Sequence, residues 1–146
     1  MPYVFIINER ESSLASFHFD SKTGDVRPIQ TVPTIPAGYT GRNAPADIRV
    51  HPNGKFLYGS NRGHDSIAIF RIDEATGKIT PVDIVSAQGS NSREFNFEPS
   101  GKYIFVTNMA TNNVVTFSVD PESGKMTPAG AKTEVPKPVC VKFATL

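Results

Sequence analysis

The sequence predicts an all-β fold built from repeated four-stranded antiparallel sheets. Three segments of the 146-residue chain align through Asn8, Asn61 and Asn108, at intervals of 53 and 47 residues. Val, Ile, Phe and Tyr are dense in each segment, and Gly, Pro, Asn and Asp interrupt them at short spacing, as is typical of strands joined by turns. A period of about 40 to 50 residues with four short strands is the signature of a β-propeller blade.

The second repeat shows the expected strands most clearly. We expect strands at residues 47–50, 56–60, 66–72 and 79–85, separated by a Pro-Asn-Gly turn, the loop NRGHD and the turn EATGK. The first repeat offers three strands, the other two offer four each, and the terminal PVCVKF segment (138–143) offers one, which makes twelve. Residues 1–146 are therefore expected to form about three blades of an incomplete propeller, with repeats near 1–45, 46–92 and 93–146. A sandwich of tandem hairpins is the alternative fold, although it would not require such matched repeats.

Composition limits the classes of partner. Fifteen basic and 14 acidic side chains give a formal net charge of +1, so we expect neither nucleic acid nor a membrane as a partner. The start MPYVFIINERE has no basic region before its apolar stretch, and no run approaches 18 apolar residues, so neither a signal peptide nor a membrane span is expected. Cys140 is the only cysteine, which excludes an internal disulfide and favours a cytoplasmic protein. Its VCV context predicts a small buried hydrophobic residue rather than a nucleophile.

One end of the blades is expected to collect the polar loops. In an up-and-down blade, the loop between strands two and three lies at the same end as the connection between blades. The residue after each aligned asparagine differs strongly between repeats (Glu9, Arg62, Met109), whereas the shared asparagines are expected to satisfy loop backbone groups or to accept unusual φ values. The other residues expected at this end come from the loops (Glu11, His64, Asp65 and Asn112) and from the connections between blades (Arg42, Asn43, Asp47, Asn91, Arg93 and Glu94).

Metal and cofactor motifs are not found in the sequence. His18, His51 and His64 fall at different places in the repeat, so they are not expected to converge on a metal. The chain has neither a G-x-S-x-G elbow nor a phosphate-binding glycine loop. We therefore expect no metal and no cofactor.

Two blocks of sequence and the chain ending resemble a known family. The blocks PADIRVHPNGKFLYGSNRGHDSIAIFRID and SREFNFEPSGKYIFVTNMATNNVVTFSVD, with VPKPVCVKF, are similar to the C-terminal part of the seven-bladed lactonase propellers, which include the bacterial-type 6-phosphogluconolactonases. The resemblance spans nearly the whole chain. It implies metal-free hydrolysis of a sugar lactone, as in the second step of the pentose phosphate route.

The resemblance also implies site residues. Glu9 in INE, Arg62 in SNRGH and Arg93 in SREF lie on matching motifs, and His64 and Asp47 follow from the same blocks. A carboxylate such as Glu9 can activate water, arginines suit an oxyanion or a phosphate, and His64 can move a proton. A seven-bladed member is more than twice as long, and the histidine from its N-terminal half has no counterpart here, so the site is expected to be incomplete.

Three functions stay open on the sequence. The chain is a sugar-lactone hydrolase of the 6-phosphogluconolactonase type, a non-catalytic propeller that binds a protein or a small anion, or a piece without activity of its own. Three blades would leave two apolar flanks uncovered, so we expect either self-association, most simply as a two-fold dimer with six blades, or further N-terminal blades.

Overall fold

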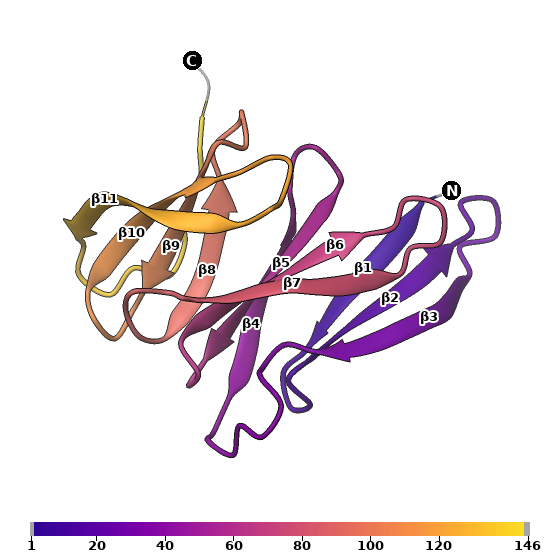
Figure 1. The fold of residues 1–146 in the computed structure, drawn as a ribbon, viewed down its shortest axis with the longest axis horizontal. Helices are drawn as coiled ribbons and strands as arrows, with labels where there is room; N and C mark the ends of the chain where they lie inside the picture. Colours follow the sequence, from indigo (N-terminus) through magenta and orange to yellow (C-terminus); the bar gives the residue numbers. More distant parts are fainter. Residues whose placement is uncertain (1, 145–146) are drawn as a thin grey trace.

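Three antiparallel sheets, arranged side by side, make up the computed structural model, which describes residues 2–144 (Figure 1). The first sheet contains β1 (Tyr3–Asn8), β2 (Ser13–Phe19) and β3 (Val26–Pro33); the second contains β4 (Ala44–Val50), β5 (Phe56–Arg62), β6 (Ser66–Ile72) and β7 (Ile79–Ser86); the third contains β8 (Ser92–Phe97), β9 (Tyr103–Asn108), β10 (Asn113–Val119) and β11 (Met126–Glu134). Each strand pairs with the next one in the chain within its sheet. The predicted all-β fold of partial propeller blades is confirmed.

The strand boundaries in the second sheet agree closely with the sequence pattern. β6 has the expected bounds, β4 begins three residues earlier than expected, and β7 ends one residue later. β5 extends through Asn61 and Arg62, so the tip of the loop is only Gly63, His64 and Asp65. Arg62 therefore lies on a strand end rather than on a free loop.

The twelfth strand of the prediction is wrong. Residues 138–143 belong to none of the ladders formed by residues 2–144. The segment instead lies against side chains of β8: the Val141 N–H donates to Glu94 Oε2 at 2.6 Å, and Asn96 Nδ2 donates to the Val141 carbonyl at 3.2 Å. An apolar β-run forms a strand only where a neighbouring backbone offers a ladder, and none of the described residues, 2–144, offers one to this segment.

The core consists of two apolar layers between the sheets. Leu14 and Val32 of the first sheet pack with Leu57, Phe70 and Ile79 of the second. The other face of the second sheet supplies Phe56, Tyr58, Ile67 and Ile69, which pack with Phe95, Val106, Val115 and Phe117 of the third sheet. Alternate side chains along β5 and β6 thus enter opposite layers, as the two-residue period of a strand requires.

The β1–β2, β5–β6 and β9–β10 hairpins share one geometry. The residue four positions after each aligned asparagine has a positive φ: 48° at Ser12, 53° at Asp65 and 54° at Asn112. Each asparagine Nδ2 donates across the hairpin to the side chain five positions on, which is Ser13 (3.0 Å), Ser66 (3.1 Å) or Asn113 (3.0 Å) for Asn8, Asn61 and Asn108 respectively. The expected bond to loop backbone is present for Asn61, which donates to the Thr34 carbonyl, and for Asn108, which donates to the Ala87 carbonyl, whereas Asn8 donates only to the Ser13 side chain.

Aspartates shape the turns at the opposite end of the sheets. Asp20, Asp73 and Asp120 each accept a hydrogen bond from the backbone N–H two residues further on, at 2.8, 2.9 and 3.0 Å. Backbone hydrogen bonds lower the pKa of Asp20 and Asp73, and the Ser123 hydroxyl together with the Glu122 N–H lowers the pKa of Asp120. The described part of the chain contains no helix that could span a membrane.

Candidate functional site

Glu9 and Arg62 form an ion pair across the first two sheets. Arg62 Nη2 lies 3.4 Å from Glu9 Oε1, and the side chains are 22% and 67% exposed, respectively. Arg62 Nε also donates to the carbonyl oxygen of Ala44 at 3.0 Å. The first strands of the two four-stranded sheets, β4 and β8, are called the inner strands. The Arg62 Nε is thus held by the backbone of β4, while the Nη2 end of the side chain lies near the exposed Glu9 carboxylate.

A buried amide network lies beneath this pair. Asn61 is fully buried, and its Oδ1 accepts from Thr34 Oγ1 at 2.8 Å and from Asn43 Nδ2 at 3.0 Å. Its Nδ2 donates to the Thr34 carbonyl at 2.8 Å and to Ser66 Oγ. Asn43 Nδ2 also donates to Ser12 Oγ at 2.9 Å, so the network joins loops of the first two sheets. Asn61 therefore fixes the strand end from which Arg62 projects.

Gly63 allows two backbone segments to lie in close contact. Its φ is 111°, and a Cβ on this residue would overlap the carbonyl of Arg42. A side chain here would force the β5–β6 loop away from the connection between the first two blades. The glycine of the SNRGH motif is thus required by geometry next to Arg62.

His64 lies in the same network as Asn61. Its Nδ1 lies 2.7 Å from Ser66 Oγ, its backbone N–H donates to Asn43 Oδ1 at 3.3 Å, and its ring meets the ring of Tyr39 edge-on at 4.8 Å. Among the hydrogen bonds and ion pairs of residues 2–144, none joins His64 to Glu9 or to Arg62. The catalytic assignment of His64 stays a prediction.

Asp47 belongs to a second charged cluster on the inner strands. Arg49 Nε lies 3.1 Å from Asp47 Oδ2, Arg49 Nη2 lies 2.8 Å from Glu94 Oε1, and Lys142 Nζ pairs with the same Glu94 oxygen. Burial by itself raises the pKa of Glu94. Hydrogen bonds from Lys142, Cys140 and Val141 together lower this pKa by more than burial raises it, so the pKa is below its usual value. Sequence reasoning missed the paired roles of Arg49, Glu94 and Lys142, although the repeat alignment places Asp47 and Glu94 at matching positions.

Both acids accept a backbone N–H from the next inner segment. The Phe95 N–H donates to Asp47 Oδ2 at 3.2 Å, and the Val141 N–H donates to Glu94 Oε2 at 2.6 Å. A β-bulge lies at each acid, because the pairing shifts between Pro45 and Ile48 in β4 and between Ser92 and Glu94 in β8. The bulges turn these carboxylates toward the neighbouring blade.

Of the other predicted residues, Arg42 and Asn91 lie on the connections between blades, whereas Arg93, which was expected there, lies on strand β8. Arg42 and Arg93 are exposed. Asn91 has a φ of 61°, donates its N–H to Asp65 Oδ1 at 3.0 Å and accepts from the Met109 N–H at 3.1 Å. Asp65, which sequence reasoning did not single out as a site residue, joins this connection to the Arg62 loop. The substrate-binding roles of Arg42, Asn91 and Asp47 and the catalytic role of Arg93 stay predictions.

Cys140 is exposed, so the prediction that it is buried is wrong. One side of its segment faces β8, whereas on the other side no strand of the described part of the chain pairs with it. A hydrogen bond with the adjacent Glu94 carboxylate, together with desolvation and the charge of that carboxylate, raises the pKa of the Cys140 thiol. Within residues 2–144, no three His, Cys, Asp or Glu side chains are grouped so that they could hold a metal ion.

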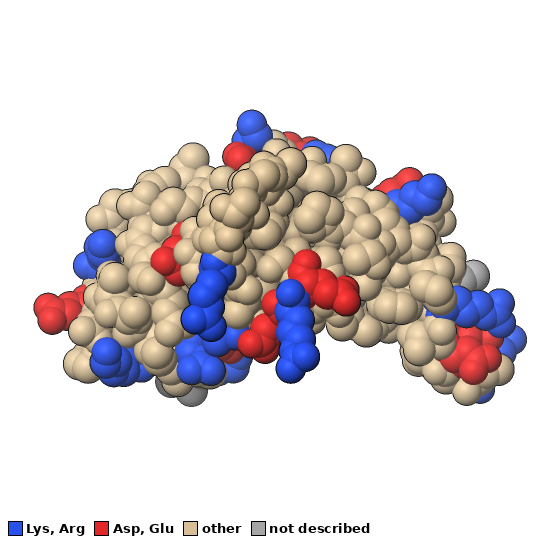
Figure 2. Space-filling model, turned by 90° about the horizontal axis from the view of Figure 1, so that it is seen from below, with Lys and Arg blue, Asp and Glu red and all other residues tan. Residues whose placement is uncertain are grey.

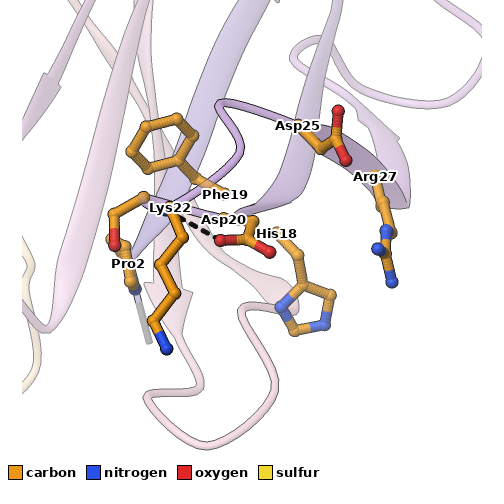
Figure 3. A pocket seen from close by; sticks show the side chains of 8 residues that line it. Pro2, His18, Phe19, Asp20, Lys22, Asp25 and Arg27 are labelled. Carbon is orange, nitrogen blue, oxygen red and sulfur yellow. Dashed lines mark hydrogen bonds between the residues drawn. The ribbon is translucent and has the colours of Figure 1, made fainter.

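Two hollows flank the first sheet at its two ends. One of about 570 Å³ is bordered by residues 7–11 and includes Glu9. The other, of about 480 Å³, lies at the far turn, where His18, Asp20, Lys22, Asp25 and Arg27 line it (Figure 3). Only the first hollow adjoins the Glu9–Arg62 pair. On the face shown in Figure 2, acidic and basic side chains lie close together. An anion would therefore be attracted by individual arginines or lysines rather than by the charge of the whole face.

The chain is similar over nearly its whole length to known lactonase propellers. Residues 1–143 match the family model described as lactonase, 7-bladed beta-propeller. The 6-phosphogluconolactonase of Bacillus subtilis is 36% identical over 141 residues, which are 97% of this chain and 40% of the relative. A protein from Lactobacillus plantarum of known structure is 36% identical with a TM-score of 0.94, over 98% of this chain and 42% of that one. The periplasmic gluconolactonase of Pseudomonas aeruginosa is 28% identical with a TM-score of 0.93, over 98% and 39% of the two chains.

These matches agree with the fold described above and extend across all three sheets. The chain spans about 40% of the length of the relatives it matches. The chain belongs to the seven-bladed lactonase β-propeller family.

Proposed function

We propose that this chain supplies part of a sugar-lactone hydrolysis site of the 6-phosphogluconolactonase type. The observation that carries the proposal is the Glu9–Arg62 pair, which places a carboxylate and a guanidinium 3.4 Å apart beside an open hollow. The names of the relatives, a 6-phosphogluconolactonase and a gluconolactonase, support a lactone as the substrate class.

The two side chains suit the two needs of lactone opening. Water attacks the carbonyl carbon, the ring C–O bond breaks, and the leaving alkoxide takes up a proton to give the open acid. Glu9 would accept the proton of the attacking water. Arg62 would stabilise the negative charge that develops on the carbonyl oxygen, because a guanidinium is permanently charged and offers paired donors. The Ala44 carbonyl fixes Arg62 beforehand, which limits reorganisation during the reaction.

The remaining candidates have supporting roles in this proposal. His64 would deliver a proton, and Arg93 and Arg42 would attract the phosphate of a phosphorylated substrate, with Asn91 on the connection that precedes β8. Asp47 has weaker support as a substrate contact, because its Oδ1 already accepts from the Ile48 N–H at 2.9 Å and its Oδ2 from Arg49 and Phe95. A cytoplasmic location stays a proposal, and one relative is described as periplasmic.

A chimera tests the proposal. This chain replaces the matching region of the Bacillus subtilis 6-phosphogluconolactonase, to which it is 36% identical over 141 residues. We expect the chimera to hydrolyse 6-phosphogluconolactone, and we expect the isolated chain to be at least about a hundredfold less active, because single groups that orient or stabilise charge contribute factors of this size. A chimera that folds with a cooperative transition but lacks lactonase activity would contradict the proposal.

A further inference from the structure

The residue with a positive φ in each hairpin holds the chain segment that leaves the same sheet. Its backbone carbonyl accepts an N–H from that segment in all three sheets, at 2.8, 2.9 and 3.0 Å: Thr34 donates to Ser12, Ala87 to Asp65 and Val135 to Asn112. This contact is therefore a general property of the fold, and only the side chain of the holding residue differs between the sheets.

Among these three residues, only Asp65 carries a charge. Its Oδ1 accepts the Gly63 N–H at 3.2 Å and the Asn91 N–H at 3.0 Å, and its Oδ2 accepts from Ser90 Oγ at 2.8 Å. One carboxylate thus joins the loop next to Arg62 to the connection between the second and third sheets.

The segment that Asp65 holds leads directly to Arg93. Asn91 has a φ of 61°, and its carbonyl accepts the Met109 N–H at 3.1 Å, so the backbone is held from both sides two residues before Arg93. The pairing of β8 with β9 shifts around Arg93, which places this residue at a β-bulge, and a bulge changes the direction of the side chain it carries. The direction of the exposed Arg93 side chain therefore depends on how the preceding backbone is held.

Asp65 lies between the two segments that carry the arginines of the proposed site. Arg62 directly precedes Gly63, and its Nε is held by the Ala44 carbonyl. A phosphorylated lactone has two groups that attract a guanidinium, the carbonyl oxygen that becomes negative and the phosphate. Both can be bound at once only if the two arginines are held at a fixed separation.

We propose that Asp65 is a positioning residue for the phosphate of the lactone. It holds the Asn91 backbone so that Arg93 meets the phosphate while Arg62 meets the carbonyl oxygen, and it touches neither group itself. Its two oxygens already accept from three donors, so the carboxylate serves the backbone rather than the substrate. This inference rests on the proposed function and adds the residue that sets the preference for a phosphorylated over an unphosphorylated lactone.

The ratio of kcat/KM for two lactones in the chimera tests this role. Asp65→Ala should lower kcat/KM for 6-phosphogluconolactone at least about tenfold, mainly through KM, and that for unphosphorylated gluconolactone less than about threefold, because only the first substrate uses Arg93. Asp65→Asn keeps the Oδ1 acceptor and suits the φ of 53°, so both values should stay within about threefold of the parent.

A turn aspartate at the opposite end of the sheets is the matched control. Asp73→Ala removes a carboxylate that accepts the Ala75 N–H at 2.9 Å, so it lowers stability without touching the site, and it should leave the ratio for the two lactones unchanged. An equal loss for both lactones in Asp65→Ala would overturn the inference, and so would a loss in Asp65→Asn as large as that in Asp65→Ala.

Binding of the reaction product separates this inference from the proposed function. In calorimetric titrations of the chimera, Asp65→Ala and Arg93→Ala should each raise the dissociation constant of 6-phosphogluconate at least about fivefold, and Asp73→Ala should not change it. A chimera that shows this pattern but lacks lactonase activity would refute the proposed function and support the role of Asp65. Unchanged affinity in Asp65→Ala would overturn that role whatever the turnover.

Discussion

The Phe95 N–H donates to the carboxylate of Asp47, which lies on the inner strand of the preceding sheet, at 3.2 Å. The same relationship recurs one blade further on between Val141 and Glu94, at 2.6 Å. Inner strands of successive blades share no backbone ladder in this structure, so an acid at a bulge links each strand to the next. This link explains why residues 138–143 are held in place without forming a strand.

Ionisation of Glu94 should make the free energy of unfolding depend on pH. Its pKa in the folded protein lies below the usual 4.5, so the unfolded chain takes up a proton first as the pH falls. The stabilisation is present above about pH 4.5 and is lost as the pH falls through that value toward the lower pKa of the folded state. Asp20, Asp73 and Asp120 have lowered pKa values and act in the same direction.

Urea unfolding between pH 6 and pH 3 measures this dependence. The free energy of unfolding should fall with pH in the parent chain and fall less steeply in Glu94→Gln. The exposed Glu134→Gln controls for the change in net charge. Equal slopes in the parent and Glu94→Gln would show that Glu94 is not responsible.

Asn61→Ala should be strongly destabilising. The change removes four hydrogen bonds of a fully buried amide and takes the Asn61 donor from the Thr34 carbonyl, whereas the side chains of Thr34, Asn43 and Ser66 keep their bonds to Ser12 and His64. Unsatisfied buried groups cost about 1 to 3 kcal/mol each, so we expect a loss of at least about 2 kcal/mol in the free energy of unfolding. Asn8→Ala, at the matching repeat position, removes one part-buried hydrogen bond and should cost about 1 kcal/mol. Similar losses for both variants would argue against the network.

Gly124→Ala should lower the free energy of unfolding by more than backbone strain at a left-handed position accounts for. A Cβ at Gly124 meets the fully buried ring of Phe56, whereas Gly54, with a φ of 76°, has open space at its Cβ. A left-handed conformation costs a non-glycine residue about 1 to 2 kcal/mol, and overpacking adds about 1 to 3 kcal/mol. Thermal or urea unfolding should place Gly124→Ala at least about 1 kcal/mol below Gly54→Ala. Equal stability of the two variants would rule out tight packing at this junction.

Cys140 should react slowly for an exposed thiol. Its raised pKa leaves little thiolate at pH 8, and thiolate is the reactive form. Glu94→Gln removes the neighbouring charge, so it should accelerate alkylation and shift the rate profile to lower pH. Iodoacetamide labelling followed by mass measurement gives these rates. An unchanged profile in Glu94→Gln would show that Glu94 does not control the thiol.

The repeat alignment predicted the blades and the common end of the site loops. The prediction of the blades from the alignment was correct because one hairpin geometry recurs. Each hairpin has a positive φ four residues after its asparagine, Asn8, Asn61 or Asn108. Glu9 and Arg62 meet for the same reason, since both follow that asparagine directly in adjacent blades.

The inner-strand cluster could not be predicted in the same way. Arg49, Glu94 and Lys142 lie on segments that read as ordinary β-runs, and their contacts cross between strands without a ladder whose register a sequence pattern could indicate. The exposure of Cys140 was missed because the VCV pattern does not show that a strand partner is absent on one side.

The measurement that tests the central claim most directly is kcat/KM for 6-phosphogluconolactone in the chimera with the Bacillus subtilis relative. Arg62→Ala should lower this value at least about tenfold, since a charge-assisted hydrogen bond contributes about 1.5 to 3 kcal/mol. Glu9→Gln should lower kcat more than it raises KM, because it keeps the shape and removes the base. The matched changes Lys55→Ala and Glu74→Gln, at the opposite end of the sheets, should leave turnover unchanged. Parental kcat/KM in both Arg62→Ala and Glu9→Gln would contradict the assignment of this pair to lactone hydrolysis.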